Sequence, residues 1–371
     1  MKTFSVEPNI KIIDSTKEFC DTYNIGKGDI VFVSEDTYKK YFNGLVNGAY
    51  ICNYRKYGSG EPTDLMVEGI YNEVKDIEYK RVIAIGGGTI LDVAKLFALK
   101  NISPVTELYD KKLEIIKDKE LILVPTTCGT GSEVTNIAIL ELTTKGTKFG
   151  LAVPELFGDD AVLIPELLEN LPFKFFGTSS IDALIHSIES YTSPKANPFT
   201  EIFSLKAMSM ILEGYKLIAK NGQDARKSII KDFLIASTYA GIAFGNAGCA
   251  AVHAMSYPLG AKYHIPHGEA NYAMFTGVYK AYMSIKSDGK IKKLNKHLAN
   301  ILNCDEADVY DEIEVLLNNI IPKKALHEYG MLESEIDEFT QSVMEKQGRL
   351  MANNFVELDS NKIKEIYRKL Y

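Results

Sequence analysis

A triple glycine placed directly after an apolar run is the feature that most restricts how this chain can fold. Residues 81–85 read Arg-Val-Ile-Ala-Ile, and Gly86, Gly87 and Gly88 follow without a break. A short apolar run bounded by turn residues is typical of a strand buried on both faces of a parallel sheet. Glycines between a strand and a helix let the backbone approach an anion closely, so that N–H groups at the helix start face a phosphate. A tight turn would use the same glycines.

Further runs of this kind occur at residues 29–33 and 121–125, and residues 64–74 carry the spacing of an amphipathic helix. Strands that alternate with helices indicate a doubly wound α/β domain, in which ligands bind at the carboxyl ends of the strands. We assign this dinucleotide-binding domain to residues 1–168.

The run at 121–125 leads into a second loop, Pro125–Glu133, in which hydroxyl side chains alternate with glycines. Such a loop offers several hydrogen-bond donors to a pyrophosphate or to a nicotinamide amide, although a plain polar loop would look similar. The common GxGxxG dinucleotide motif is absent. Two glycine-rich strand exits in one α/β domain nevertheless favour a dinucleotide. The side chains considered are those of Thr89, Asp92, Thr126, Thr127, Thr130 and Ser132.

Glu35 follows the run at 29–33. An acidic side chain at this place can accept hydrogen bonds from the ribose hydroxyls of the adenosine and repel a 2′-phosphate, which favours NAD over NADP. An exposed acid in a turn is the alternative.

The chain changes character near residues 165–172, where strand-like runs largely stop and helical patterns take over. We therefore predict an all-helical metal and substrate domain over residues 169–371. The helical patterns span residues 178–191, 199–220, 226–242, 247–259, 268–284, 290–302, 306–320, 334–349 and 360–370.

Asp182 and His186 lie four residues apart in an apolar setting, which places both on one face of a buried helix. His253 and His267 follow in segments rich in small residues. One carboxylate and three imidazoles form a mixed oxygen and nitrogen ligand set that suits Fe(II) or Zn(II) better than Mg or Ca. Each residue alone is also compatible with an ordinary hydrogen-bonded core position.

Composition narrows the class of protein further. With 371 residues and a formal net charge of −7, the chain lacks the basic surface that a nucleic-acid partner requires. The first residues contain no long apolar run, so we expect neither a signal peptide nor a membrane span. The five cysteines lack CxxC spacing, which fits reduced thiols in the cytoplasm.

Taken together, these segments resemble the iron-containing (group III) alcohol dehydrogenase family. Gly86–Lys95 is similar to the family signature GGGSxxDxAK, Pro125–Glu133 matches PTTxGTGSE, and Asp182–Glu189 matches DALxHxxE. The two-histidine stretch is matched by Ala247–Met255, Pro258–Gly260 and Pro266–Gly268. The motifs keep the order found in the family and cover about residues 30 to 275.

The resemblance implies the dehydroquinate synthase-like architecture of these alcohol dehydrogenases, with an NAD-binding domain and a helical metal domain. It implies Fe(II), or Zn(II), held by Asp182, His186, His253 and His267, a small-molecule alcohol or aldehyde as substrate, and a homodimer or larger homo-oligomer. His253 and His267 would serve catalysis through the metal. Tyr257 stands where many members have a second histidine, and Glu61 stands where many have asparagine.

Within the family the likeness extends over most of the chain to members that act on 4-hydroxybutyrate and succinate semialdehyde. Lys262, Tyr257, His264 and Arg349 are the candidates for holding the substrate carboxylate, and each could equally have an ordinary structural role. Dehydrogenation of simple short-chain alcohols or diols, a dehydroquinate synthase-like lyase reaction and non-enzymatic metal binding are the alternatives.

Overall fold

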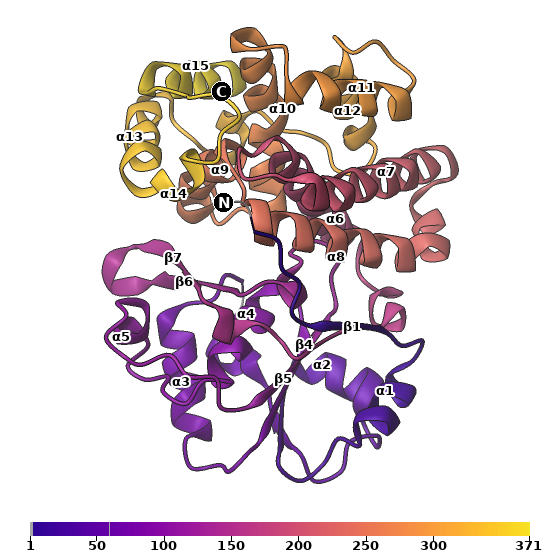
Figure 1. Ribbon diagram of the computed structural model, residues 1–371, viewed down its shortest axis with the longest axis vertical. Helices are drawn as coiled ribbons and strands as arrows, with labels where there is room; N and C mark the ends of the chain where they lie inside the picture. Colours follow the sequence, from indigo (N-terminus) through magenta and orange to yellow (C-terminus); the bar gives the residue numbers. More distant parts are fainter. Residues whose placement is uncertain (1–2, 59) are drawn as a thin grey trace. The chain divides into compact units, whose positions relative to one another are not determined.

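The protein is described by a computed structural model that covers residues 3–58 and 60–371. The chain divides into two compact units. One is Val6–Leu171, and the other is Pro172–Tyr371 together with the first residues up to Ser5. Figure 1 labels helices and strands of both units.

These units differ from the predicted domain ranges of 1–168 and 169–371 by three residues at the junction and by the assignment of the N-terminal residues. The first residues join the helical unit because the ring of Phe4 stacks on Phe199 and Phe203, with centroid distances of 5.5 and 5.8 Å. The backbone of Ser5 also forms hydrogen bonds with the Asn246 side chain. A single aromatic residue near a chain end gives no sequence signal for such docking.

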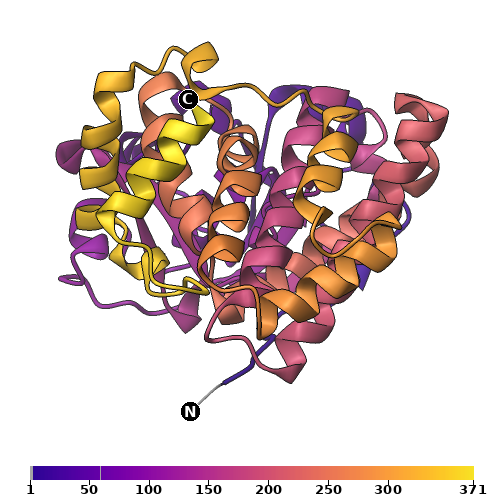
Figure 2. The ribbon, with the colours of Figure 1, turned by 90° about the horizontal axis from the view of Figure 1, so that it is seen from above.

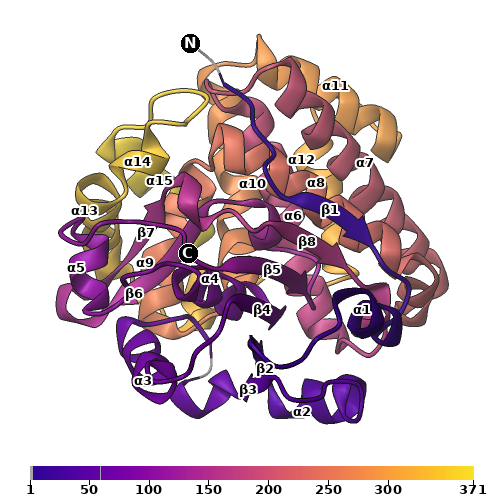
Figure 3. The same ribbon diagram turned by 60° about the horizontal axis from the view of Figure 1, so that its bottom comes forward.

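The α/β unit is built on a six-stranded sheet with the order β1-β8-β5-β4-β2-β3, and every pair in it is parallel. Figure 3 shows the strands in this order. The strands are β1 Asn9–Ile12, β2 Asp29–Val33, β3 Tyr50–Cys52, β4 Arg81–Gly86, β5 Glu120–Pro125 and β8 Asp160–Leu163. The prediction of an α/β domain is confirmed, and the three predicted strands are neighbours in the middle of the sheet.

The carboxyl ends of the three central strands, β2, β4 and β5, lie level with one another in the sheet. Val33 pairs with Ile85, and Gly86 pairs with Pro125. Because parallel strands end at one edge, the segments that follow β2, β4 and β5 leave the sheet side by side. The Thr126 N–H donates to the Gly86 carbonyl at 3.0 Å, which ties two of these exits together.

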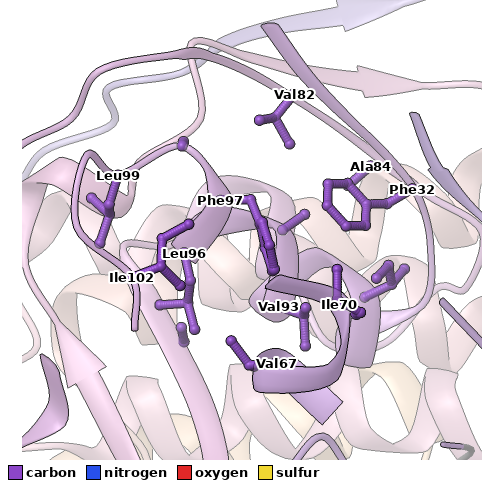
Figure 4. Close-up of a cluster of buried hydrophobic side chains, with 14 of the residues drawn as sticks. Phe32, Val67, Ile70, Val82, Ala84, Val93, Leu96, Phe97, Leu99 and Ile102 are labelled. Carbon is purple, nitrogen blue, oxygen red and sulfur yellow. The ribbon is translucent and has the colours of Figure 1, made fainter. Parts of the chain in front are cut away.

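Helices and a hairpin cover the sheet. The helices are α1 Thr16–Tyr23, α2 Glu35–Thr37, α3 Asp64–Val74, α4 Gly88–Phe97 and α5 Val105–Tyr109, and the hairpin pairs β6 Ile137–Leu142 with β7 Thr147–Ala152. Figure 4 shows the core between α3, α4 and the sheet. Phe32 of β2 and Phe97 of α4 meet there with ring centroids 5.0 Å apart, and both are fully buried.

The second unit is helical, as predicted, and its helices lie side by side in Figure 2. They are α6 Phe173–Thr192, α7 Pro198–Asn221, α8 Ile230–Ala247, α9 Ala251–Tyr263, α10 His267–Ile285, α11 Lys290–Leu302, α12 Val309–Asn318, α13 Ile336–Lys346, α14 Gly348–Met351 and α15 Ser360–Leu370. Helix α6 packs against α7, α8 and α10, and every residue from Ser180 to Thr192 is buried. A polar side chain on such a helix needs partners, because burial without them is costly.

None of the described helices, taken singly, is long and apolar enough to cross a membrane. One bent pair, Gln223–Ala247 with Ala251–Tyr263, passes the same test of length and composition, with an angle of 105° between its halves.

Candidate metal centre and cofactor loops

Four candidate ligands converge inside the helical unit from three helices. Asp182 and His186 stand one turn apart on α6, His253 lies in α9, and His267 begins α10. One donor atom from each lies within 4.8 Å of the others. The Asp182 carboxylate is 3.9 Å from His186 Nε2, 3.7 Å from His253 Nε2 and 3.9 Å from His267 Nε2. Donors bound tetrahedrally to one first-row ion lie about 3.3 Å apart, so a small contraction would close the set.

Burial separates the four candidates. The side chains of Asp182, His186 and His253 are at most 6% exposed, whereas that of His267 is 29% exposed. Burial disfavours a charged carboxyl group at Asp182, but the neighbouring imidazoles outweigh it and hold the pKa of Asp182 below its ordinary value. The carboxylate is therefore ionised, as a metal ligand must be. The solvent-accessible side of the cluster is the side of His267.

His253 is held by a carboxylate behind it. Its Nδ1 lies 2.5 Å from Glu189 Oε2, and the other oxygen of Glu189 accepts the Val252 N–H at 2.7 Å. A carboxylate at Nδ1 fixes the tautomer whose Nε2 lone pair points to the metal side. Burial opposes a charged ring, but Cys249 and Glu189 outweigh it and raise the pKa of His253 well above its ordinary value. A metal would therefore bind at Nε2 by displacing the proton from that nitrogen.

The residues present fit a metal ion. Among the described buried side chains, His253 Nε2 is one of the few polar atoms without a hydrogen-bond partner, and it belongs to the cluster. Leaving such an atom unsatisfied costs about 1–3 kcal/mol. A cation at this place would satisfy it, and three nitrogens with one oxygen suit Fe(II) or Zn(II).

Two neighbours of the ligands were missed by the sequence analysis. Cys249 is buried beside His253 and His186, whose imidazoles lower the pKa of its thiol although burial alone would raise it. The Phe244 ring stacks on His186 with centroids 4.2 Å apart. The available signal for Cys249 was its position four residues before a ligand.

Tyr257 lies one turn beyond His253 on α9. It is half-buried, and its ring centroid is 5.8 Å from that of His267. The residue that replaces the second histidine of the family therefore lies beside the ligand cluster.

The other candidates for holding a substrate carboxylate differ in their surroundings. Lys262 is bound to Glu335 Oε1 at 2.5 Å and to Glu338 Oε2 at 3.3 Å. His264 is exposed and ends α9 in the left-handed conformation with φ of 52°. Arg349 is exposed on α14. Among these candidates for holding the substrate carboxylate, Tyr257 is the one whose ring lies beside a candidate metal ligand, His267.

In the α/β unit the triple glycine lies where β4 passes into α4. Gly87 caps the helix and Gly88 begins it. A Cβ on Gly88 would lie 2.6 Å from Thr130 Cγ2, so the two glycine-rich loops touch at a point where any side chain would force Thr130 to shift. The start of α4 suits a phosphate, as helix N-termini do, although the Ile90 N–H already donates to the Gly87 carbonyl at 3.1 Å. Thr126, Thr127 and Thr130 are half-buried in the second loop.

Three of the nominated cofactor residues have other partners. Ser132 donates to Asp92 Oδ1, and Asp92 Oδ2 accepts the Ile139 N–H at 3.0 Å. Thr89 donates to the Gly60 carbonyl at 2.7 Å. Asp92 and Ser132 therefore hold the two loops together.

Lys95, which the sequence analysis did not single out, completes this junction. It is fully buried, and its Nζ donates to Ser132 Oγ at 2.8 Å and to the Ile137 carbonyl at 2.7 Å. Burial lowers the pKa of Lys95, and the nearby Asp92 carboxylate opposes that shift. The lysine supplies the charge that balances Asp92.

Glu35 begins α2 directly after β2. It is exposed and forms an ion pair with Lys39 one turn later. Glu35 therefore follows the carboxyl end of β2, one of the central strands of the sheet.

Comparison with known proteins agrees with this geometry. The profile of the family described as "Iron-containing alcohol dehydrogenase" matches residues 13–165, and that of "Fe-containing alcohol dehydrogenase family, C-terminal" matches residues 176–371. The chain belongs to the iron-containing alcohol dehydrogenase family. The first matched range contains the two glycine-rich loops, and the second contains the four candidate ligands.

Relatives of this alcohol dehydrogenase differ in how much of the chain they match. It is 48% identical over 371 residues, 100% of both chains, to 4-hydroxybutyrate dehydrogenase of Clostridium kluyveri. It is 32% identical to long-chain-alcohol dehydrogenase 1 of Geobacillus thermodenitrificans over 80% of this chain and 76% of the relative.

Solved structures of similar fold include sulfoacetaldehyde reductase from Bifidobacterium kashiwanohense in complex with NAD+. It is 22% identical with a TM-score of 0.85, over 100% of this chain and 98% of the other. A 1,3-propanediol oxidoreductase has a TM-score of 0.84 at 22% identity, over 100% of both chains. At this identity the likeness supports the fold.

Proposed function

We propose that this enzyme interconverts 4-hydroxybutyrate and succinate semialdehyde, with NAD as hydride carrier and Fe(II), or Zn(II), held by Asp182, His186, His253 and His267. The observation that carries the metal-dependent chemistry is the convergence of these four donors around the unsatisfied His253 Nε2. The substrate follows from the full-length identity of 48% to a relative of that name.

When bound, a divalent metal supplies Lewis acidity that stabilises negative charge on a substrate oxygen, and the nicotinamide carries the hydride. The chain's own contribution is positioning. Glu189 orients the His253 ring, and the more exposed His267 marks the side from which substrate reaches the ligands.

Tyr257 lies on that side, and we assign it contact with the substrate. A neutral phenol is a poor base, but its hydroxyl is a good hydrogen-bond donor. Tyr257 would therefore hold and orient the substrate by a hydrogen bond. Lys262 is a poorer anchor, because two glutamates already neutralise its ammonium.

The α/β unit would bind the cofactor through the segments that follow its central strands. The glycines at 86–88 allow the pyrophosphate to approach the start of α4. Glu35 would accept hydrogen bonds from the adenosine ribose and exclude a 2′-phosphate, which makes NAD the preferred cofactor.

We also propose a homo-oligomer in the cytoplasm. The edge strand β1 is exposed along its length, and Ile10 and Ile12 are 41% and 48% exposed. An exposed edge with apolar side chains is a surface for pairing between copies. None of the five cysteines forms a disulfide, in keeping with a reducing compartment. Light scattering at several concentrations tests the assembly, and a monomer throughout would contradict it.

The test of function is NADH formation by protein reconstituted anaerobically with Fe(II) or Zn(II). We expect kcat/KM for 4-hydroxybutyrate to exceed that for 1-butanol, which has the same carbon count but no carboxylate. His267→Ala should lose both bound metal and turnover. Equal or greater efficiency with 1-butanol would favour a simple-alcohol dehydrogenase, and full activity of the variant would refute the site.

A further inference from the structure

A buried amide lies against two of the four candidate ligands. Asn271 follows His267 by one turn on α10 and is fully buried. Its Nδ2 is 2.7 Å from Asp182 Oδ1 and 3.2 Å from His267 Nε2. Asp182 Oδ1 is also the oxygen nearest to His253 and His267, so a group that fixes this atom fixes two distances of the cluster.

Ser256 sets the orientation of that amide. It lies on α9, three residues after His253, and its hydroxyl contacts Asn271 Oδ1 at 2.5 Å and the His253 carbonyl at 3.0 Å. Neither the His253 carbonyl nor the amide oxygen of Asn271 can donate, and the single hydroxyl proton is assigned to the shorter contact, the one with Asn271 Oδ1. With Oδ1 accepting from Ser256, the Nδ2 side must face Asp182.

The backbone near Asn271 is also fixed against α6. A Cβ on Gly268 would collide with the Thr178 carbonyl and lie 3.2 Å from Asp182 Cβ. The first turn of α10 therefore lies directly on the turn of α6 that carries Asp182. This close approach is what lets the short side chain of Asn271 reach across.

We infer that Asn271, oriented by Ser256, is a positioning residue that holds the Asp182 carboxylate in the arrangement required for metal binding. The inference rests on the proposed metal site. A carboxylate on a helix can rotate about two bonds, and a charged acceptor fixed by an amide donor loses that freedom before the metal arrives. Outer partners of this kind typically change metal affinity by about 10–100-fold.

A purely structural role would predict something different. Asn295 provides the matched control, because it is a buried asparagine of the same unit that bonds to Tyr310 and Met283 away from the cluster. If Asn271 acts only by filling the core, Asn271→Ala and Asn295→Ala should lower stability alike and leave the metal site unchanged.

The experiment measures Zn(II) affinity of the full chain by competition with a chromophoric chelator, and the visible spectrum of the Co(II)-loaded protein. Urea unfolding with excess chelator reports stability separately. We expect Asn271→Ala to weaken Zn(II) binding about 10–100-fold and to alter the Co(II) spectrum. Asn295→Ala should change neither.

Ser256→Ala should weaken binding less, and the double variant should be no worse than Asn271→Ala, because both residues act through one bond. Should Asn271→Ala fail to fold, Ser256→Ala carries the same test. Wild-type affinity and spectrum in these variants, or equal losses in Asn295→Ala, would overturn the inference alone. Absence of metal binding by the wild type would overturn the proposed function with it.

Discussion

Glu189 Oε2 lies 2.5 Å from His253 Nδ1, in the buried interior of the helical unit. The two side chains are 64 residues apart in the chain, yet both belong to motifs recognised in the sequence. The carboxylate determines which nitrogen of His253 carries the proton, and the other nitrogen is the candidate ligand.

Glu189→Gln should therefore weaken metal binding. The substitution keeps the size of the side chain but removes the charge that orients the imidazole, and we expect a loss of about 10–100-fold in Zn(II) affinity. Chelator competition measures it. Glu201→Gln is the control. It removes a partly exposed carboxylate of α7 that pairs with Lys290, and it should bind Zn(II) as tightly as the wild type does. Unchanged affinity in Glu189→Gln would mean that Glu189 does not set the tautomer.

Lys95→Met should loosen the two glycine-rich loops. The variant leaves the Asp92 carboxylate without its nearest cation, and breaking a buried pair in this way costs about 3–5 kcal/mol. We expect a lower urea midpoint and a higher Kd for NADH, measured by fluorescence, with Zn(II) affinity unaffected. Lys17→Met, at an exposed lysine of α1, should change none of these quantities. If NADH binds Lys95→Met as tightly as the wild type, the junction is not needed for the cofactor.

The parts of the fold that could be predicted are those with a local signal. The strands β2, β4 and β5 are buried on both faces, so their apolar runs stand out. β1 and β3 contain only four and three residues, and β1 is exposed. Neither shows the run of buried apolar residues by which the others were recognised. The hairpin partner β6 alternates half-buried and buried positions, a pattern overlooked in favour of continuous runs.

The candidate ligands were predictable because two share a helix turn and all four stand in recognised motifs. The roles of Asn271, Cys249 and Lys95 were not predicted. Asn271 and Cys249 lie against side chains from other parts of the chain, and Lys95 binds Ser132 and the Ile137 carbonyl outside its own helix. Asn271 gains its role because α10 crosses α6 at Gly268, and no spacing in the chain encodes that crossing. The ligands can be recognised in the sequence by residue type and motif, whereas the residues that contact them can be identified only once the packing of the helices is known.

Cofactor choice should depend on Glu35. Replacing it by serine removes the charge that would oppose a 2′-phosphate, and its partner Lys39 would then be available to attract one. We expect the ratio of kcat/KM for NAD to that for NADP to fall by about tenfold or more in Glu35→Ser, since tenfold corresponds to about 1.4 kcal/mol. Asp36→Ser tests a neighbouring exposed acid and should leave the ratio near the wild-type value. A ratio unchanged in Glu35→Ser would contradict the assignment.

The Glu335 carboxylate binds Lys262 and Tyr263 at the end of α9, shortly before His267, and we expect the stability that it contributes to be lost in acid. Glu335 accepts hydrogen bonds from Lys262, Tyr263 and the Leu332 N–H, and these lower its pKa to about 2. A carboxyl group whose pKa is lower in the folded than in the unfolded state stabilises the fold above its unfolded value of 4.5. That contribution is lost as the pH falls from there toward 2.

Glu335→Gln should accordingly be less stable than the wild type at pH 7, by about 1–2 kcal/mol from the lost charged hydrogen bonds. The difference in the free energy of unfolding should shrink below about pH 4.5. Urea titrations at pH 7 and pH 4 measure it. If the difference in the free energy of unfolding between Glu335→Gln and the wild type is the same at pH 7, pH 4 and pH 3.5, the charge of Glu335 does not stabilise the fold.

Tyr257 distinguishes this chain from members of the family with a second histidine at the same place. Tyr257→Phe retains the ring that packs 5.8 Å from His267 and removes only the hydroxyl. Loss of one hydrogen bond to substrate, worth about 1–1.5 kcal/mol, should lower kcat/KM for 4-hydroxybutyrate by about tenfold while Zn(II) affinity stays constant. Tyr257→His would introduce a group that titrates near pH 6.5, so its pH–rate profile should gain a limb in that region that the wild type lacks. If Tyr257→Phe has the kcat/KM of the wild type, Tyr257 does not bind the substrate. Arg349 would then be the next candidate for holding the substrate carboxylate.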